Sequence, residues 1–165
     1  MQGKGLIKGI GCLLLLLLTL YLARALSQKR KRRLYLSEGL LLLLNHLCAS
    51  LSCASLPLSA IYASFYHEGL AQVGFLADLK EEGLAYALER AREVLCLTEE
   101  ERALLCPFAK RLGKGFLAEE KALCLYTAES FVRLYQGQKE AFSKKHRAEQ
   151  ALVLTGGLMV ILLLL

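Results

Sequence analysis

Apolar residues form two long runs at the ends of the chain. Residues 10–22 and residues 151–165 consist almost entirely of Leu, Ile, Val and small residues. The first run extends over residues 6–26 if the basic side chains at its edges reach outward, and this length gives about 31 Å of helix, close to the hydrocarbon thickness of a bilayer. The second run gives about 22 Å. We expect an N-terminal transmembrane anchor at residues 1–28 and a shorter C-terminal transmembrane anchor at residues 148–165.

Between the two ends, apolar positions recur with helical spacing, which predicts one helical domain at residues 29–147. The chain has only two prolines, and it shows no alternating strand pattern over a useful length. The predicted fold class is all-α: an antiparallel helical bundle with hydrophobic membrane-spanning helices at both termini. The pattern predicts helices at residues 33–55, 58–68, 84–95, 99–112 and 117–150.

Local signals place several ends of these helices. Pro57 suits the first turn of a helix, because its missing N–H is not needed there. Thr98 and Glu101 form the pattern of a capping box. Pro107 lies inside the helix that follows and is expected to kink it or split it in two, and Gly113 is expected to end it. The last predicted helix has no breaking residue before the C-terminal run, so it can continue into the second anchor.

Five consecutive leucines stand near the start of the predicted domain. A run of this kind places apolar groups on every side of the helix, so the helix is either central in the domain, in contact with a partner, or dipping into a membrane. If the leucines are exposed, they form a contiguous apolar patch of the kind that marks an interaction site. The candidate partner surface consists of Leu40, Leu41, Leu42, Leu43 and Leu44.

Positive charge is concentrated beside the two apolar runs. The formal net charge is +6 at pH 7, and residues 24–33 alone contribute that amount, whereas residues 34–143 are net negative. An acidic domain lacks the positive surface that nucleic-acid binding needs, so we expect no nucleic-acid partner. Basic residues that flank apolar helices stay on the cytoplasmic side and attract anionic lipid headgroups. The membrane-proximal basic cluster consists of Arg24, Lys29, Arg30, Lys31, Arg32, Arg33, Lys144, Lys145 and Arg147.

The N-terminal run also permits a different interpretation. Its core is as short as that of a signal peptide, and Ala23-Arg24-Ala25 supplies a small-residue cleavage pattern. Cleavage there would produce an exported small helical protein. The six positive charges directly downstream resist translocation, so we favour a retained anchor with the domain on the cytoplasmic side.

We expect neither an enzyme nor a metal or cofactor site. His46, His67 and His146 fall in separate predicted helices without His or Cys partners at metal-ligand spacing. Ser64 and His67 are one helical turn apart, but the sequence supplies no acid to complete a triad. The six cysteines lack C-x-x-C spacing and stand among Leu and Ala, which favours reduced, apolar cysteines. The paired glutamates lie at the starts of predicted helices, where they complement the helix dipole.

Taken together, these parts resemble the stage III sporulation protein AB family of endospore-forming bacteria. The resemblance covers nearly the whole chain: an N-terminal apolar span followed by Ala-Arg-Ala-Leu-Ser, a Leu-rich helix closing on Leu56-Pro57-Leu58, a helix ending in Lys110-Arg111-Leu112-Gly113, and a final Leu154-Thr155-Gly156-Gly157-Leu158 segment. The chain departs from the pattern at Pro107 and at Lys114-Gly115.

This resemblance implies a component of the channel between mother cell and forespore, located in the mother-cell membrane with its domain in the cytoplasm. Members of the family look like the cytoplasmic helical domains of the inner-membrane platform protein of type II secretion. By that analogy, the partners would be the membrane proteins of the channel and a cytoplasmic ATPase, in addition to membrane lipids.

Overall fold

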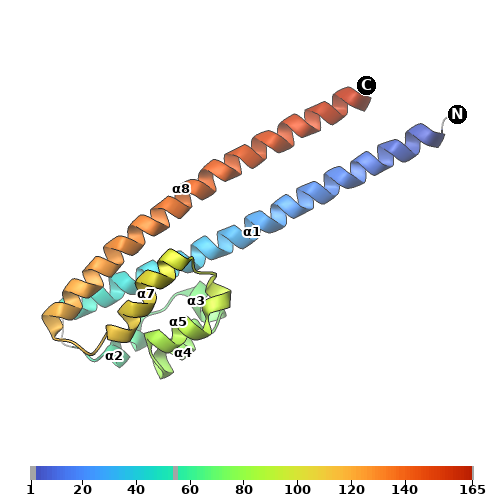
Figure 1. Cartoon of the computed structure of the whole chain (residues 1–165). Helices are drawn as coiled ribbons and strands as arrows, with labels where there is room; N and C mark the ends of the chain where they lie inside the picture. The colour runs from blue at the N-terminus through green and yellow to red at the C-terminus, as the bar shows by residue number, and fades with distance from the viewer. Residues whose placement is uncertain (1–2, 54–55, 165) are drawn as a thin grey trace. The chain divides into compact units, whose positions relative to one another are not determined.

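The computed structural model describes the backbone of residues 3–53 and 56–164, and side chains mainly within residues 24–145. All elements in this part of the chain are helices, which confirms the all-α prediction (Figure 1). The chain divides into two compact units. The central unit comprises Arg33–Gln138, and the terminal unit comprises Met1–Arg32 together with Lys139–Leu165.

Helix α1 (Gly3–Cys53) contributes the longest stripe of core residues to the central unit. Its buried leucines recur at intervals of three and four residues, as expected for one face of a helix. Each of these leucines is at most 4% exposed: Leu36, Leu40, Leu43, Leu44, Leu47 and Leu51. The helix ends within two residues of its predicted C-terminus, and it is continuous with the N-terminal segment rather than separated from it.

The next two helices correct one predicted boundary. Pro57 precedes α2 (Leu58–Ser64) as its N-cap, and Phe65 ends that helix in an extended conformation with its side chain buried. The chain then forms α3 (Glu68–Gln72), so residues 58–68 are not one helix. The reason is a capping interaction, because a ring nitrogen of His67 accepts a hydrogen bond from the backbone N–H of Leu70 at 3.4 Å.

Three short helices follow in the central unit: α4 (Phe75–Glu81), α5 (Leu84–Arg90) and α6 (Arg92–Leu95). Gly74 precedes α4 with φ +79°, a conformation in which only glycine is unstrained. The predicted helix over residues 84–95 is divided at Ala91, so its inner face is buried as expected but Val94 turns outward and is 45% exposed.

Helix α7 (Glu99–Arg111) begins at the predicted capping box of Thr98 and Glu101, in which both reciprocal hydrogen bonds form. Pro107 neither ends nor splits the helix. Pro107 and Ala103, the residue one turn earlier, are both exposed, so water can reach the carbonyl that lacks an N–H partner. The helix is followed by Gly113 at φ +82°, the predicted glycine stop.

Helix α8 (Leu117–Leu164) runs without interruption into the C-terminal segment, as its sequence allowed. Within the central unit, α1 and α8 are antiparallel. Residues late in α1 meet residues early in α8, since the Nζ of Lys121 lies 3.5 Å from the carbonyl oxygen of Ser52 and the sulfur of Cys124 lies beside that of Cys48. The core between the helices is filled by Phe75, Phe108 and Phe131, each at most 2% exposed.

In the terminal unit, the backbone of both predicted anchors is helical, but most of their side chains lie outside the described residues. Among the described residues, one helical stretch, Ser27–Ser52, is long and apolar enough to cross a membrane, with a mean hydropathy of 1.4. In its most apolar window, 44% is buried inside the structure. Because its leucines fill the core of the central unit, we assign this stretch to the folded domain.

Candidate functional site

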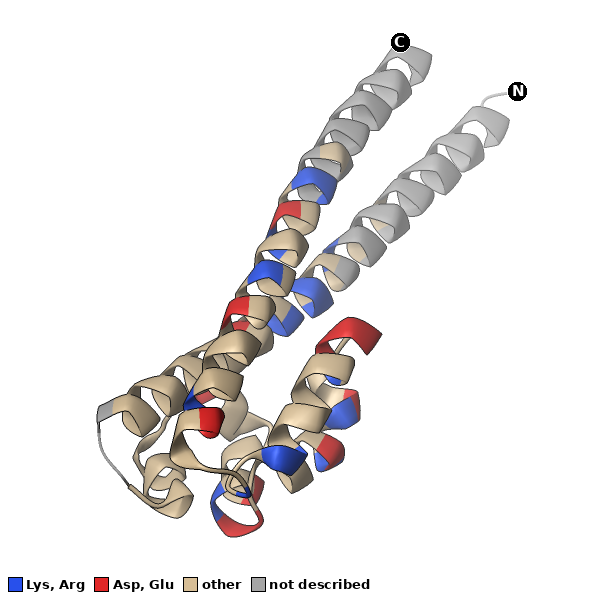
Figure 2. Ribbon diagram, turned by 60° about the vertical axis from the view of Figure 1, so that its left-hand side comes forward, with Lys and Arg blue, Asp and Glu red and all other residues tan. Residues whose placement is uncertain are grey.

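The basic cluster predicted from sequence lies on the part of α1 that leads into the central unit, where basic residues are shown in blue in Figure 2. Arg24, Lys29, Lys31 and Arg32 are exposed, and Arg30 is partly buried. On α8, Lys144 and Lys145 are exposed as well, whereas the side chain of Arg147 lies outside the described residues.

Arg33 departs from the rest of the cluster. Its guanidinium group turns toward the protein, with Nη2 3.5 Å from Oε2 of Glu101 and two thirds of the side chain covered. Arg33 therefore contacts the buried carboxylate of Glu101 in the central unit. We exclude it from the residues that are available to lipid headgroups.

Glu101 makes several polar contacts with described residues of the central unit, and its side chain is fully buried. Its Oε2 accepts hydrogen bonds from the backbone N–H of Thr98 at 2.7 Å and from the Thr98 hydroxyl at 3.1 Å. Its Oε1 accepts from the side-chain amide of Gln138 at 2.9 Å and from the hydroxyl of Ser37 at 3.4 Å. One carboxylate thus joins α1, α7 and α8, and the saturated set of donors around it indicates a structural role.

Sequence reasoning recognised Glu101 only as a capping residue. The capping signal is local, four residues long, and therefore visible in the sequence. The contacts with Ser37 and Gln138 span 64 and 37 residues, and no local pattern reports contacts of that kind.

A histidine–serine contact also forms, but between different partners from those weighed in the sequence. Nε2 of His46 lies 2.9 Å from Oγ of Ser64, while His67 caps α3 and packs against the ring of Tyr35. The Ser64 hydroxyl donates its hydrogen to the carbonyl of Ile61 at 2.8 Å, so it accepts a hydrogen bond from His46. A serine whose proton is directed at a backbone carbonyl, and which accepts from the histidine, is not an activated nucleophile in this arrangement.

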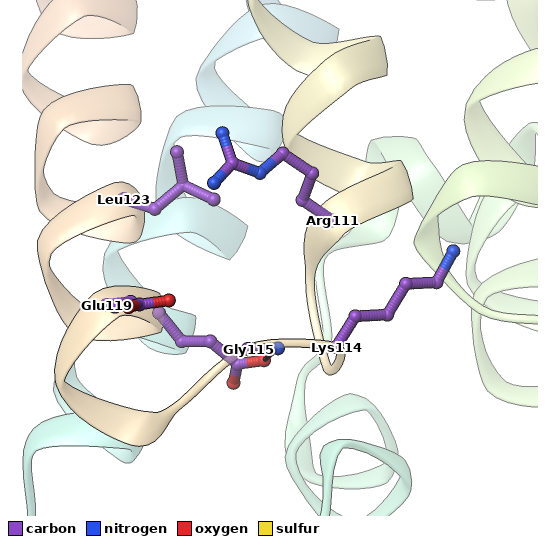
Figure 3. A pocket seen from close by; sticks show the side chains of 6 residues that line it. Arg111, Lys114, Gly115, Glu119 and Leu123 are labelled. Carbon is purple, nitrogen blue, oxygen red and sulfur yellow. Dashed lines mark hydrogen bonds between the residues drawn. The ribbon is translucent and has the colours of Figure 1, made fainter.

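A small cavity lies between the end of α7 and the start of α8 (Figure 3). Its volume is about 210 Å³, below the usual range for ligand pockets. Basic Arg111 and Lys114 line it together with acidic Glu119 and Glu120, and the N–H of Gly115 donates to Oε1 of Glu120 at 3.1 Å. Both positive and negative side chains line the cavity, and its backbone N–H donor is already paired. The lining therefore favours neither an anionic nor a cationic ligand.

The predicted partner surface is largely part of the core. Leu40, Leu43 and Leu44 are at most 2% exposed and Leu41 packs against the core, which leaves Leu42, 48% exposed, as the one open member. The prediction of a contiguous exposed patch is therefore wrong. The run instead contributes to the core, because α1 contacts α2, α7 and α8 while one of its faces stays exposed.

Among the described residues, no group of three or more His, Cys, Asp or Glu side chains is placed to hold a metal ion.

Comparison with curated proteins and with solved structures gives no significant match. The model of one protein family, stage III sporulation protein AB, matches residues 8–165. Because this match covers nearly the whole sequence, the chain belongs to the stage III sporulation protein AB family.

Proposed function

We propose that this chain is a non-enzymatic membrane scaffold of the channel between mother cell and forespore. In this proposal, both ends are anchored in the mother-cell membrane, and the central unit lies in the mother-cell cytoplasm. There it docks the cytoplasmic ATPase and membrane proteins of the channel. Membership of a family of stage III sporulation proteins supports the process, and the charge pattern of the chain supports the location.

The observation that carries the proposal is the position of the α1 part of the basic cluster, Arg24 and residues 29–32, between the N-terminal apolar run and the folded unit. Lys29, Lys31 and Arg32 are exposed and directly follow that run, so they can meet a membrane surface. Near an anionic leaflet, each such charge contributes about 1 kcal/mol. The same charges oppose translocation of the residues that follow them, which favours a cytoplasmic central unit.

Cys96 offers a direct test of this orientation, because it is exposed in the central unit, directly after α6. Full-length protein in intact spheroplasts is treated with a membrane-impermeant maleimide, and again after the membrane has been permeabilised. We expect labelling at Cys96 only after permeabilisation, and Cys96→Ser serves as the matched control. Labelling at Cys96 in intact spheroplasts would contradict the proposal. A mature N-terminus at Leu26 would instead establish the exported protein with a cleaved leader.

The docking role is tested with Leu42, the exposed member of the leucine run. We expect Leu42→Glu to weaken co-purification of the channel ATPase with the full-length protein while leaving the helical content unchanged. Tyr86→Glu, a change at a similarly exposed apolar position on α5, is the control. If both variants bind the ATPase as the parent does, Leu42 is not part of a docking surface.

A further inference from the structure

Two cysteines far apart in the sequence meet inside the central unit. Cys48 on α1 and Cys124 on α8 are 76 positions apart, yet their sulfur atoms lie 2.6 Å from each other. A disulfide bond is about 2.05 Å long, so forming one requires the two sulfurs to approach by only a small distance. Reduced, apolar cysteines were expected from the sequence, and Cys48 and Cys124 are free cysteines in the structure, but their contact was not anticipated.

We propose that Cys48 and Cys124 are a disulfide-forming pair, which peroxide converts into a covalent link between α1 and α8. This inference is independent of the proposed function, because it depends only on the packing of the central unit.

The two thiols differ in ways that assign their roles. Cys48 is partly exposed, whereas Cys124 is fully buried, so an oxidant reaches Cys48 first. The hydrogen bond between the two thiols lowers the pKa of Cys48, which increases the fraction of the reactive thiolate. The same hydrogen bond and burial raise the pKa of Cys124, which therefore keeps its proton until Cys48 has been oxidised.

The reaction balances with hydrogen peroxide as the oxidant. The Cys48 thiolate attacks one peroxide oxygen, the O–O bond breaks, and Cys48 becomes a sulfenic acid as hydroxide leaves and takes up the proton that Cys48 had released. The sulfur of Cys124 then attacks the sulfur of Cys48, the S–S bond forms, and the S–O bond breaks. The departing hydroxide takes the proton of Cys124 and leaves as water. Two thiols are oxidised, and one peroxide is reduced to two waters.

The test uses the full-length chain in detergent micelles. In a pair-only variant, serine replaces Cys12, Cys53, Cys96 and Cys106, so that Cys48 and Cys124 are the remaining thiols. After treatment with equimolar hydrogen peroxide, we expect both thiols to resist alkylation together. The monomer should lose the mass of two hydrogen atoms, and dithiothreitol should restore both thiols. Because the link closes a long loop, the thermal unfolding midpoint should rise by on the order of 10 °C.

The matched control retains Cys96 and Cys106 in place of the pair. The Cys96 thiol donates to the carbonyl of Glu93 rather than to another sulfur, so we expect no intrachain link in this variant. If the control forms an intrachain link as fast as the pair-only variant, the contact between Cys48 and Cys124 confers no special reactivity and the proposal fails.

The proposal also fails if Cys48 is oxidised while Cys124 remains open to alkylation, if crosslinks join only separate chains, or if neither thiol reacts. Peptide mapping of the unsubstituted chain after the same treatment provides a second measurement that does not depend on the folding of the variant. A linked peptide pair containing Cys48 and Cys124 supports the proposal, and its absence contradicts it.

Discussion

Replacing Glu101 by alanine removes the carboxylate that joins α1, α7 and α8. A hydrogen bond to a charged acceptor contributes about 1.5–3 kcal/mol, and removing one member of a buried ion pair costs about 3–5 kcal/mol. The contacts of Glu101 share one side chain, so these values do not add. The side chain of Arg33 is one third exposed, but its Nε and Nη2 atoms are buried, so Glu101→Ala leaves part of the guanidinium without a partner and we expect a loss of about 3 kcal/mol.

The loss is measured by urea unfolding of the full-length chain in detergent micelles, followed by near-ultraviolet circular dichroism of the tyrosines. This signal reports the packing of the central unit, where Tyr62 is 6% exposed. For a unit of this size, an m-value of about 1.5 kcal/mol per molar urea converts the loss of Glu101 into a midpoint about 2 M lower.

The neighbouring glutamates provide matched controls for the Glu101 variant. Glu100 is exposed, and Glu99 makes an exposed ion pair with Arg102 at 2.9 Å, so alanine at either position should cost at most about 0.5 kcal/mol. Glu101→Gln keeps one acceptor oxygen but loses the charge, and it should fall between Glu101→Ala and the controls. A single neutral hydrogen bond contributes about 1 kcal/mol. If the free energies of unfolding of Glu101→Ala and Glu100→Ala differ by less than this amount, Glu101 does not join the three helices as we infer.

Three further predictions follow from burial and packing. Leu43→Ala should cost about 2–5 kcal/mol in urea unfolding because Leu43 is fully buried, whereas Leu42→Ala should cost less than about 1 kcal/mol; equal losses would contradict the assigned stripe. Gly39→Ala should destabilise the protein, since its Cβ would lie 2.6 Å from a histidine ring atom, whereas Gly137→Ala meets open space and should stabilise the helix by about 0.5–1 kcal/mol in the same assay. Burial raises the pKa of Tyr62 to about 12, so the unfolded chain loses the hydroxyl proton at a lower pH than the folded chain does. The free energy of unfolding should therefore fall as the pH rises from 10 to 12. Tyr62→Phe should reduce this fall in unfolding curves measured across the same pH range.

The sequence allowed correct prediction of features that depend on local signals. The capping box at Thr98 and Glu101, the glycine stop at Gly113 and the uninterrupted α8 all form as expected, because each depends on residues within about one helical turn. The division after Ser64 was missed, although its signal was present. His67 lies three residues before Leu70 and caps α3 by accepting a hydrogen bond from the backbone N–H of Leu70. Histidine is an uncommon N-cap, so His67 was assigned to the helix.

Contacts between distant segments could not be predicted from one sequence. The sulfur contact joins Cys48 and Cys124, and the carboxylate of Glu101 reaches Ser37 and Gln138. Each pair depends on how two helices are aligned along their lengths, and that alignment is set by the summed packing of the core rather than by either residue. The serine–histidine contact changed partners for the same reason, since Ser64 meets His46 of α1 and not its near neighbour His67.

The leucine run shows how a core helix differs from a membrane span of similar composition. Within Ser27–Ser52, the exposed residues from Tyr35 onward recur every three or four positions, and Glu38, Asn45 and Ser52 occupy this stripe at seven-residue intervals. A helix in a folded unit needs such a stripe, because one of its faces meets water. Residues 10–22 contain no charged residue and no polar stripe at that spacing. A helix without a face for water requires an apolar environment on all sides. This difference in pattern, rather than in total hydropathy, is the physical reason to propose lipid around residues 10–22 and protein around Ser27–Ser52.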